Sequence, residues 1–188
     1  MKQIYFVTKN QGKFDFIKCI LSKFGVKVIQ IQLESPEPRT DNLQKIVKEK
    51  VLFGYKRIKK PCIALDAGLY IHSLNGFPKT FVNFVLETIG VDGILKLVDG
   101  KPRNCEFRNC LAYFNGKSIE PLYFEFNIKG TLSKVPRGRI KKHSWGKIHS
   151  IFIPKGTNRT LAEMSSVEYR NLILQRFDGL SKKFGKYI

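Results

Sequence analysis

The segment Ala64–Phe81, ALDAGLYIHSLNGFPKTF, joins two features that narrow the choice of fold. It continues an apolar run that starts at Pro61, and this run is typical of a buried strand that ends on a carboxylate, Asp66. Such a carboxylate often points into a cleft above the sheet. Asn75-Gly76-Phe77-Pro78 then favours a rigid turn, because it places Gly next to Phe-Pro. We expect an α/β fold in which Asp66 faces a cleft.

Strands and helices alternate on either side of this segment. Apolar residues at helical spacing predict a helix over Gly12–Phe24, and Asp41 is a candidate cap for a helix ending near Ile58. Asn115-Gly116 supplies the residues of a two-residue hairpin turn. The other expected elements are strands at Ile4–Thr8, Val26–Leu33, Glu106–Phe114, Ile119–Leu132 and Ile148–Ile153, loops at Ser35–Thr40 and Pro136–Lys147, and helices at Phe81–Ile89, Val91–Leu97 and Ser166–Phe184. This order predicts one domain over residues 1–188, with an elongated mixed sheet, a long antiparallel hairpin and flanking helices.

Two further segments indicate an anion or metal site. Thr8-Lys9-Asn10-Gln11-Gly12-Lys13 lies between the first strand and the first helix, where backbone N–H groups and a lysine favour phosphate. Glu37 lies in the proline-rich loop, and together with Asp66 it could hold Mg²⁺ against a triphosphate. Taken alone, each of these carboxylates is better explained as a turn residue or a helix cap.

Composition excludes several classes of protein. No stretch approaches the roughly 20 apolar residues of a membrane-spanning helix, and the first residues lack the pattern of a signal peptide. We therefore expect a cytoplasmic protein, or one of an organelle interior, with no membrane partner. The four cysteines form no Cys-x-x-Cys pair, which favours buried thiols over a zinc site. The formal net charge is +19, which favours a polyanionic partner, although a lysine-rich composition alone would also produce it.

The order of these motifs resembles the inosine/xanthosine triphosphate pyrophosphatase (ITPase-like, Ham1-like) family along nearly the whole chain. The family's opening Thr-Gly-Asn-x-x-Lys corresponds to Thr8-Lys9-Asn10 and Lys13, and its Pro-Glu motif corresponds to Pro36-Glu37. Further matching blocks are Leu65-Asp66-Ala67-Gly68-Leu69, Ser73-Leu74-Asn75-Gly76-Phe77-Pro78, Glu87-Thr88-Ile89-Gly90, Gly93-Ile94-Leu95-Lys96-Leu97, Ser150-Ile151-Phe152-Ile153-Pro154 and Ala162-Glu163-Met164.

This resemblance implies an elongated α/β/α domain with a central cleft, usually assembled as a homodimer. It implies Mg²⁺-dependent hydrolysis of damaged purine triphosphates such as ITP and XTP, which yields the monophosphate and pyrophosphate. Asn10 and Lys13, next to Thr8, would bind the triphosphate. Glu37 would ligate the metal, and Asp66 would ligate it or orient the attacking water. Of the family's Ser-His-Arg triplet, only the arginine remains, as Arg176.

The chain also departs from the family pattern. Leu65 replaces the first acid of an acid-Asp pair, and His149 stands near the place of an Asp that contacts the purine. A helix lysine that relatives direct at phosphate aligns with Leu52, although Lys50 is close. Lysines replace glycines beside the cleft, at Lys9, Lys79 and Lys147, and would insert cationic side chains into it. The family's later Glu-Lys pair and Ser-His dipeptide correspond to Glu168-Tyr169 and Leu174-Gln175.

Two hypotheses follow. The first is a catalytically impaired family member, repurposed to bind RNA or a ribonucleoprotein through basic residues and one stacking aromatic. These candidate contacts are Lys56, Arg57, Lys59, Lys60, Arg137, Arg139, Lys141, Lys142 and Trp145. The alternative is an active Mg²⁺-dependent pyrophosphatase that hydrolyses damaged purine triphosphates.

Overall fold

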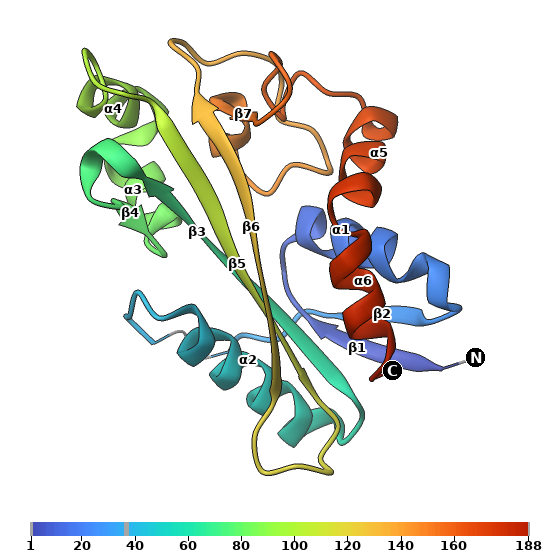
Figure 1. The fold of residues 1–188 in the computed structure, drawn as a ribbon. Helices are drawn as coiled ribbons and strands as arrows, with labels where there is room; N and C mark the ends of the chain where they lie inside the picture. The colour runs from blue at the N-terminus through green and yellow to red at the C-terminus, as the bar shows by residue number, and fades with distance from the viewer. Residues whose placement is uncertain (1, 36–37, 188) are drawn as a thin grey trace.

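The computed structural model describes residues 2–35 and 38–187, which fold around a mixed seven-stranded sheet (Figure 1). The strand order is β2-β1-β3-β5-β6-β7, and the short β4 pairs with β3 outside this path. The strands are β1 (Gln3–Val7), β2 (Lys27–Ile31), β3 (Cys62–Ile71), β4 (Pro78–Lys79), β5 (Asn104–Phe114), β6 (Leu122–Leu132) and β7 (Phe152–Pro154). The expected α/β fold with a long antiparallel hairpin is confirmed.

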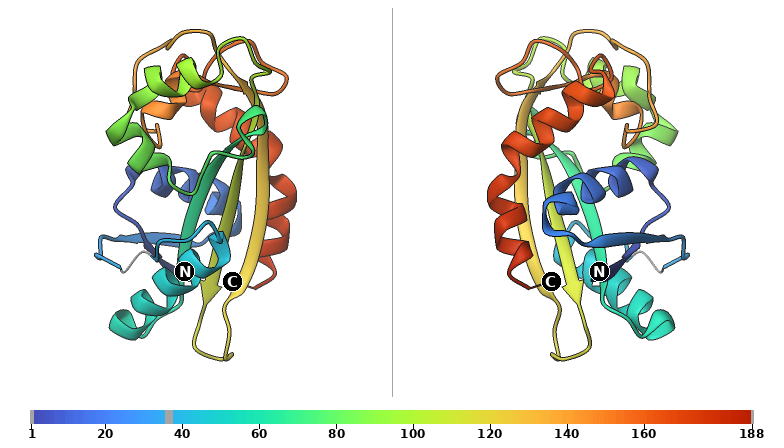
Figure 2. Two further views of the ribbon diagram at one scale, coloured as in Figure 1. Left: turned by 90° about the vertical axis from the view of Figure 1, so that its left-hand side faces the viewer. Right: turned by 90° about the vertical axis from the view of Figure 1, so that its right-hand side faces the viewer.

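Helices cover both faces of this sheet (Figures 1 and 2). The helix α2 packs on one face, while α1, α5 and α6 lie on the other, and α3 and α4 follow β4 at the upper end. The helices are α1 (Gln11–Leu21), α2 (Leu43–Ile58), α3 (Val82–Thr88), α4 (Gly90–Leu97), α5 (Ser166–Arg176) and α6 (Asp178–Gly185), with 3₁₀ turns η1 (Ser22–Phe24), η2 (His72–Leu74) and η3 (Lys147–Ser150). No helix in the described ranges is long and apolar enough to cross a membrane.

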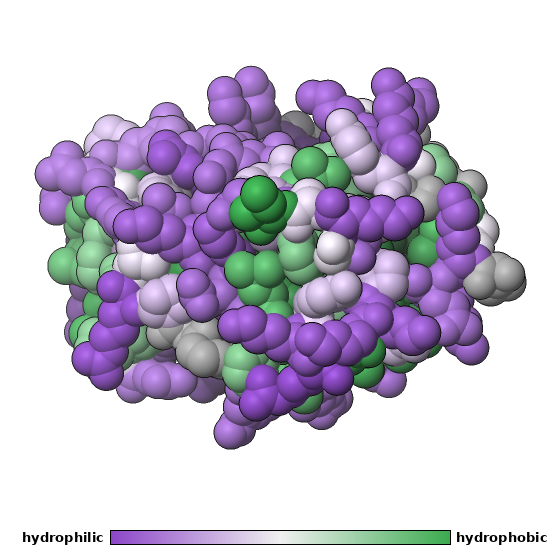
Figure 3. Space-filling model, turned by 90° about the horizontal axis from the view of Figure 1, so that it is seen from below, coloured by the Kyte–Doolittle hydropathy of each residue, from purple (hydrophilic) through white to green (hydrophobic). Residues whose placement is uncertain are grey.

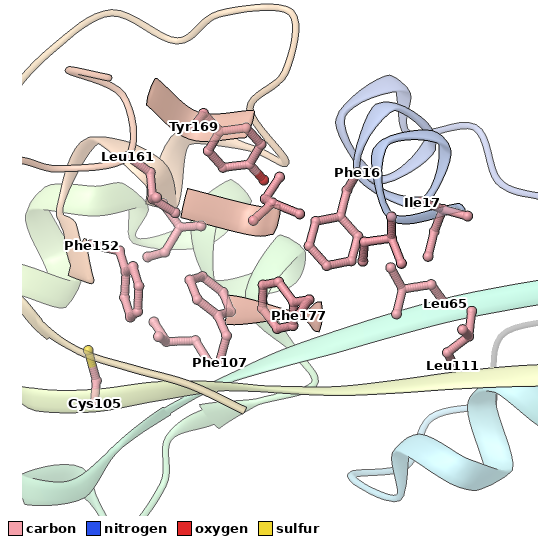
Figure 4. Packing of buried hydrophobic residues seen from close by; sticks show 14 of the residues in the cluster. Phe16, Ile17, Leu65, Cys105, Phe107, Leu111, Phe152, Leu161, Tyr169 and Phe177 are labelled. Carbon is pink, nitrogen blue, oxygen red and sulfur yellow. The ribbon is translucent and has the colours of Figure 1, made fainter. Parts of the chain in front are cut away.

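One hydrophobic cluster lies on each face of the sheet. The larger one joins α1, α5 and the upper sheet, and Figure 4 shows Phe16, Phe107 and Phe177 converging in it. Phe16 packs edge-on against Phe177 at 5.2 Å between ring centroids. The smaller cluster lies under α2 and contains Val47 and Val51. Alternation along β3 explains the division, because neighbouring side chains on a strand point to opposite faces of the sheet.

Unequal strand lengths open one edge of the sheet. β1 pairs with β3 only at Tyr5–Cys62 and Phe6–Ile63, and it ends at Val7. β4 covers the same edge again at Leu69 and Tyr70. Between these contacts, the edge of β3 around Asp66 has no neighbouring strand in the described part of the chain. A crevice beyond the carboxyl end of a parallel strand is where open α/β sheets bind ligands.

Several expected boundaries were wrong, each because tertiary contacts changed a local preference. Asp66 lies inside β3 and not at its end, because β5 pairs with β3 along its whole length. Asn42 caps α2 instead of Asp41, since its side chain accepts from the Lys45 N–H. The hairpin loop extends from Asn115 to Pro121, beyond the expected two residues.

The C-terminal part of the chain differs in the same way. The expected strand Ile148–Ile153 divides into the 3₁₀ turn η3 and the short β7. The expected helix Ser166–Phe184 breaks at Phe177, whose side chain is buried against Phe16 and Phe126. In both places, burial of apolar side chains in the main cluster bends the backbone away from a regular element.

Candidate active site

A cleft of about 530 Å³ lies against the open edge of β3. Its polar lining comes from the β1–α1 loop with α1, from α2 and from β3, which contribute Asn10, Lys13, Lys50 and Asp66. Its apolar lining includes Val82, Leu86, Phe107, Trp145 and Ile148. Trp145 lies next to the charged groups, since Lys13 Nζ is 5.9 Å from the centre of its ring. The cleft therefore offers both charged groups and apolar surface.

Asp66 lies between two lysines that come from different helices. Lys13 Nζ and Lys50 Nζ each donate to Asp66 Oδ1, both at 3.1 Å. The side chains of Asp66, Lys13 and Lys50 are 14%, 16% and 11% exposed, so solvent screens these ion pairs only weakly. No described residue hydrogen-bonds to Asp66 Oδ2, which is thus the oxygen left for a ligand in the cleft.

The two ammonium groups keep the Asp66 carboxylate ionised. Burial by itself raises the pKa of Asp66, because it disfavours the charged form. The charges and hydrogen bonds of Lys13 and Lys50 outweigh that effect, and the pKa of Asp66 lies below its ordinary value. An ionised carboxylate in this position can bind a cation or accept a hydrogen bond from water.

Asn10 fixes the entrance to α1. Its side-chain oxygen accepts from the Lys13 N–H at 2.9 Å, which caps the helix. Its amide nitrogen donates to the Trp145 carbonyl at 2.9 Å. Close packing requires Gly12 here, since a Cβ at that position would lie 2.6 Å from the Ser144 carbonyl oxygen. The start of α1 is therefore held against the 143–146 segment, with Lys13 aimed at Asp66.

The lysines that replace family glycines do not fill the cleft as expected. Lys79 Nζ pairs with Asp41 at 2.7 Å, and its side chain lines a separate, shallow depression. Lys9 remains at the cleft rim, where it pairs with Glu34 at 2.6 Å. Lys147 is exposed and does not line the cleft. Two of these three cations are thus neutralised by carboxylates on neighbouring loops.

Lys50 is a candidate site residue that the sequence alone did not select, although it lies two positions from the aligned Leu52. Lys50 lies on the buried stripe of α2 with Ile46, Val47 and Val51. The sequence did contain a signal for Lys50, namely a lysine within the apolar stripe of a predicted helix. A lysine is rarely buried without a partner, so this position indicates a buried ion pair. The alignment of Leu52 with the family's phosphate-directed lysine does not describe the geometry, since Leu52 packs in the smaller cluster and Lys50 faces Asp66.

The structure separates the remaining candidate substrate residues. Thr8 lines the cleft with Asn10, Lys13 and Asp66. Arg176 lies elsewhere: it donates to the Lys155 carbonyl and lines a separate small cavity. Glu37 falls outside the described residues, so its predicted metal role stays a prediction. No group of three or more His, Cys, Asp or Glu side chains that could hold a metal occurs within residues 2–35 and 38–187.

His149 is buried behind the cleft instead of lining it. It is 1% exposed and packs among Phe107, Trp145 and Tyr169, with ring centroids 6.2–6.3 Å away. Burial, followed by the nearby His143, lowers the pKa of His149 to about 3, so the imidazole is neutral. The cavity beside it measures about 20 Å³, which suits about one water molecule and not a nucleobase.

The candidate nucleic-acid contacts fall into two groups. Within the 136–147 loop, Arg137 pairs with Glu163 and Lys141 donates to the Met164 carbonyl. Trp145 packs edge-on against Phe16 at 5.2 Å. Those three side chains form contacts within the protein. The others are exposed: Lys56, Arg57, Lys59, Lys60, Arg139 and Lys142.

Comparison with known proteins assigns the family. The model of the Ham1 family matches residues 4–184, nearly the whole chain. The chain belongs to the Ham1 family. A relative from Methanopyrus kandleri, named dITP/XTP pyrophosphatase, is 34% identical over 93% of this chain and 94% of its own length. Another from Pyrococcus horikoshii with the same name is 33% identical over 97% of this chain and 95% of its own.

Solved structures agree with the Ham1 fold. A HAM1 protein from Coxiella burnetii superposes with a TM-score of 0.80 at 21% identity, covering 99% of this chain and all of that one. A dITP/XTP pyrophosphatase from Mycobacterium abscessus gives a TM-score of 0.70 at 22% identity, covering 96% and 97% of the two chains. At these identities the likeness concerns the fold alone. In this Ham1 chain, the cleft lies at the open edge of β3.

Proposed function

We propose that this chain is an active Mg²⁺-dependent nucleoside triphosphate pyrophosphatase that acts on purine nucleotides such as dITP and XTP. The observation that carries the proposal is the ionised Asp66, held by Lys13 and Lys50 in a cleft with an open Oδ2. The names of relatives at 33–34% identity support the substrate class. This reading replaces the impaired, repurposed protein as the preferred hypothesis.

The charged and the apolar lining of the cleft match the two parts of a nucleotide. Lys13 and Lys50 supply cationic groups that suit the triphosphate. Phe107, Leu86 and Trp145 offer apolar surface on which a base can lie. Because His149 is buried behind Trp145, we do not assign it the contact with the purine.

The donors present fit a magnesium ion that arrives with its substrate. Mg²⁺ is usually bound by one or two carboxylates together with phosphate oxygens and water. Asp66 Oδ2 supplies one such carboxylate oxygen, and Glu37 is the proposed second. The ion, when bound, would neutralise phosphate charge and favour ionisation of a nearby water.

The side chains of the chain itself then define the rest of the reaction. A water attacks the α-phosphorus, the bond to the bridging oxygen of the β-phosphate breaks, and the water's proton passes to solvent. Lys13 and Lys50 move from Asp66 to the phosphate oxygens and stabilise the charge of the leaving pyrophosphate. Asp66, with its lowered pKa, orients water or metal instead of storing the proton.

Pyrophosphate release tests this proposal. Purified protein is incubated with Mg²⁺ and ITP, XTP, dUTP or ATP. We expect release from ITP and XTP, reduced at least about 100-fold in Asp66→Asn, because both metal binding and charge balance are lost. Asp41→Asn is the matched control, since this exposed carboxylate pairs with Lys79 outside the cleft. The absence of release from every nucleotide would reject the proposal. The homodimer and the cytoplasmic location stay predictions.

A further inference from the structure

The lower end of the molecule, remote from the cleft, carries a concentrated group of unpaired cations. Lys56, Arg57, Lys59 and Lys60 lie at and beyond the end of α2, and Lys117 lies in the β5–β6 loop. We call these five residues the α2-end patch. The end of α2 and the loop are in contact. Gly116 of the loop packs so closely on Tyr55 of α2 that a Cβ at Gly116 would overlap the Tyr55 hydroxyl. Figure 3 views this end from below, and most of the surface is hydrophilic.

These cations lack the carboxylate partners that three other surface lysines have. Lys9, Lys48 and Lys79 each pair with an acid at 2.6–2.7 Å. None of the five patch residues forms an ion pair within the described ranges of the chain. The helix dipole accounts for cations in the last turn of α2, but not for Lys60 or Lys117 beyond it.

Two features indicate that the patch is arranged for contact. The Arg57 guanidinium lies 3.6 Å from the centre of the Phe53 ring, and Lys59 Nζ lies 5.9 Å from that of Tyr55, which limits the freedom of both side chains. Lys59 also adopts φ 53°, a conformation in which glycine is usual at the end of a helix. The chain thus keeps a cation where a glycine would be more stable.

We propose that the α2-end patch binds the phosphate backbone of single-stranded RNA. Several unpaired cations that are exposed and close together release counterions when they contact successive phosphates, which favours a flexible polyanion. An anionic membrane fits less well, since the large apolar side chain most exposed beside the patch is the lone Ile119. This binding is independent of the cleft and of the proposed pyrophosphatase activity.

The test compares two variants that lose the same charge. One replaces the five patch residues with Gln. The control replaces five exposed lysines at the opposite end, Lys96, Lys101, Lys129, Lys134 and Lys155, with Gln. Binding to a labelled uridine oligomer of about 15 nucleotides is followed by fluorescence anisotropy over a range of salt concentrations. Pyrophosphate release and circular dichroism monitor the fold of each protein.

We expect the patch variant to lose at least about tenfold in affinity and to lower the salt slope of log K by about 3, while the control changes little. Equal losses in both variants would mean that bulk charge alone binds the RNA, and would overturn the proposal. So would the absence of binding at about 50 mM salt, or binding to phosphatidylserine vesicles but not to RNA. If the five-site variant does not fold, Lys59→Gly replaces it, and weaker RNA binding in this more stable protein is the expected result.

Discussion

At the scale of single residues, the charge of Asp66 depends on two lysines that reach it from opposite faces of the sheet. Lys13 belongs to α1 and Lys50 to α2, and both donate to the same carboxylate oxygen. They can meet because β1 stops at Val7 and leaves the edge of β3 uncovered. In the proposed reaction, these two ammonium groups would pass from Asp66 to phosphate oxygens by side-chain movement.

Replacing Lys50 tests this arrangement. Lys50→Met removes one ammonium group, and we expect kcat/KM to fall about 10–100-fold, since a hydrogen bond to a charged group contributes about 1.5–3 kcal/mol. Because burial alone raises the pKa of Asp66, the acid limb of the pH profile moves to higher pH. Lys48→Met is the control. Lys48 lies on the surface of the same helix, where it pairs with Glu120 of the β5–β6 loop. An unchanged acid limb in Lys50→Met contradicts the assignment.

His149 makes the fold sensitive to acid. In the unfolded chain a histidine titrates near pH 6.5, whereas burial lowers the pKa of folded His149 to about 3. Between these values the unfolded chain binds a proton that the folded chain does not. The free energy of unfolding therefore falls as pH drops below about 6.5, by at most about 1.4 kcal/mol per pH unit. The folded pKa of Asp66 is also lowered, but its stabilising effect is lost only below about pH 4.

Urea unfolding between about pH 7 and 4.5 measures this effect apart from that of Asp66. We expect His149→Phe to flatten the pH dependence, because phenylalanine cannot be protonated and the pocket is aromatic. His72→Gln removes an exposed histidine and serves as the control. A pH slope that is the same in the His149 variant and the wild type would rule out His149 as its source.

At the scale of elements, α2 connects the cleft with the patch. One face of the helix is buried under β3 and β5 and carries Lys50, and its last turn carries Lys56 and Arg57. The side chain of Asn42 caps its first turn, and a left-handed Lys59 ends it. The buried face of the helix thus presents Lys50 to the cleft, and its last turn presents Lys56 and Arg57 to solvent.

The end of α2 is open to a direct test. Lys59 has φ 53°, which costs a residue with a Cβ about 1–2 kcal/mol relative to glycine. We expect Lys59→Gly to stabilise the fold by about 0.5–1 kcal/mol after the greater freedom of glycine in the unfolded chain is included. Lys56→Gly makes the same exchange inside the helix and should destabilise it by about 1 kcal/mol. Equal effects of the two variants in urea unfolding would contradict the strain argument.

At the scale of the whole molecule, positive charge exceeds what the described ion pairs neutralise. A formal net charge of +19 produces self-repulsion in the compact state, and dissolved salt screens it. We expect the melting temperature to rise between about 20 and 300 mM NaCl, which differential scanning calorimetry can follow. The five-site glutamine variant of the α2-end patch has a lower net charge and should show a smaller rise. A melting temperature that falls with salt would mean that attractive ion pairs dominate.

The sequence by itself determined much of the architecture and the family. Apolar runs located β3 and β5, helical spacing located α1, and the motif order indicated Ham1-like relatives. It also selected Asp66, Asn10 and Lys13, which the structure brings to one cleft. The strands, the helix and the motifs are local features, because neighbouring residues determine the preferred backbone conformation and make up each motif.

Only the tertiary structure decided which charges meet. Lys50 faces Asp66 and Leu52 does not, because packing on β3 and β5 sets the rotation of α2 about its axis. The tertiary structure turned Lys79 toward Asp41 and buried His149 behind Trp145, since both outcomes depend on segments far apart in the chain. Ion pairs and burial act through space, so a sequence names the charged residues while the packing of helices on the sheet determines their partners.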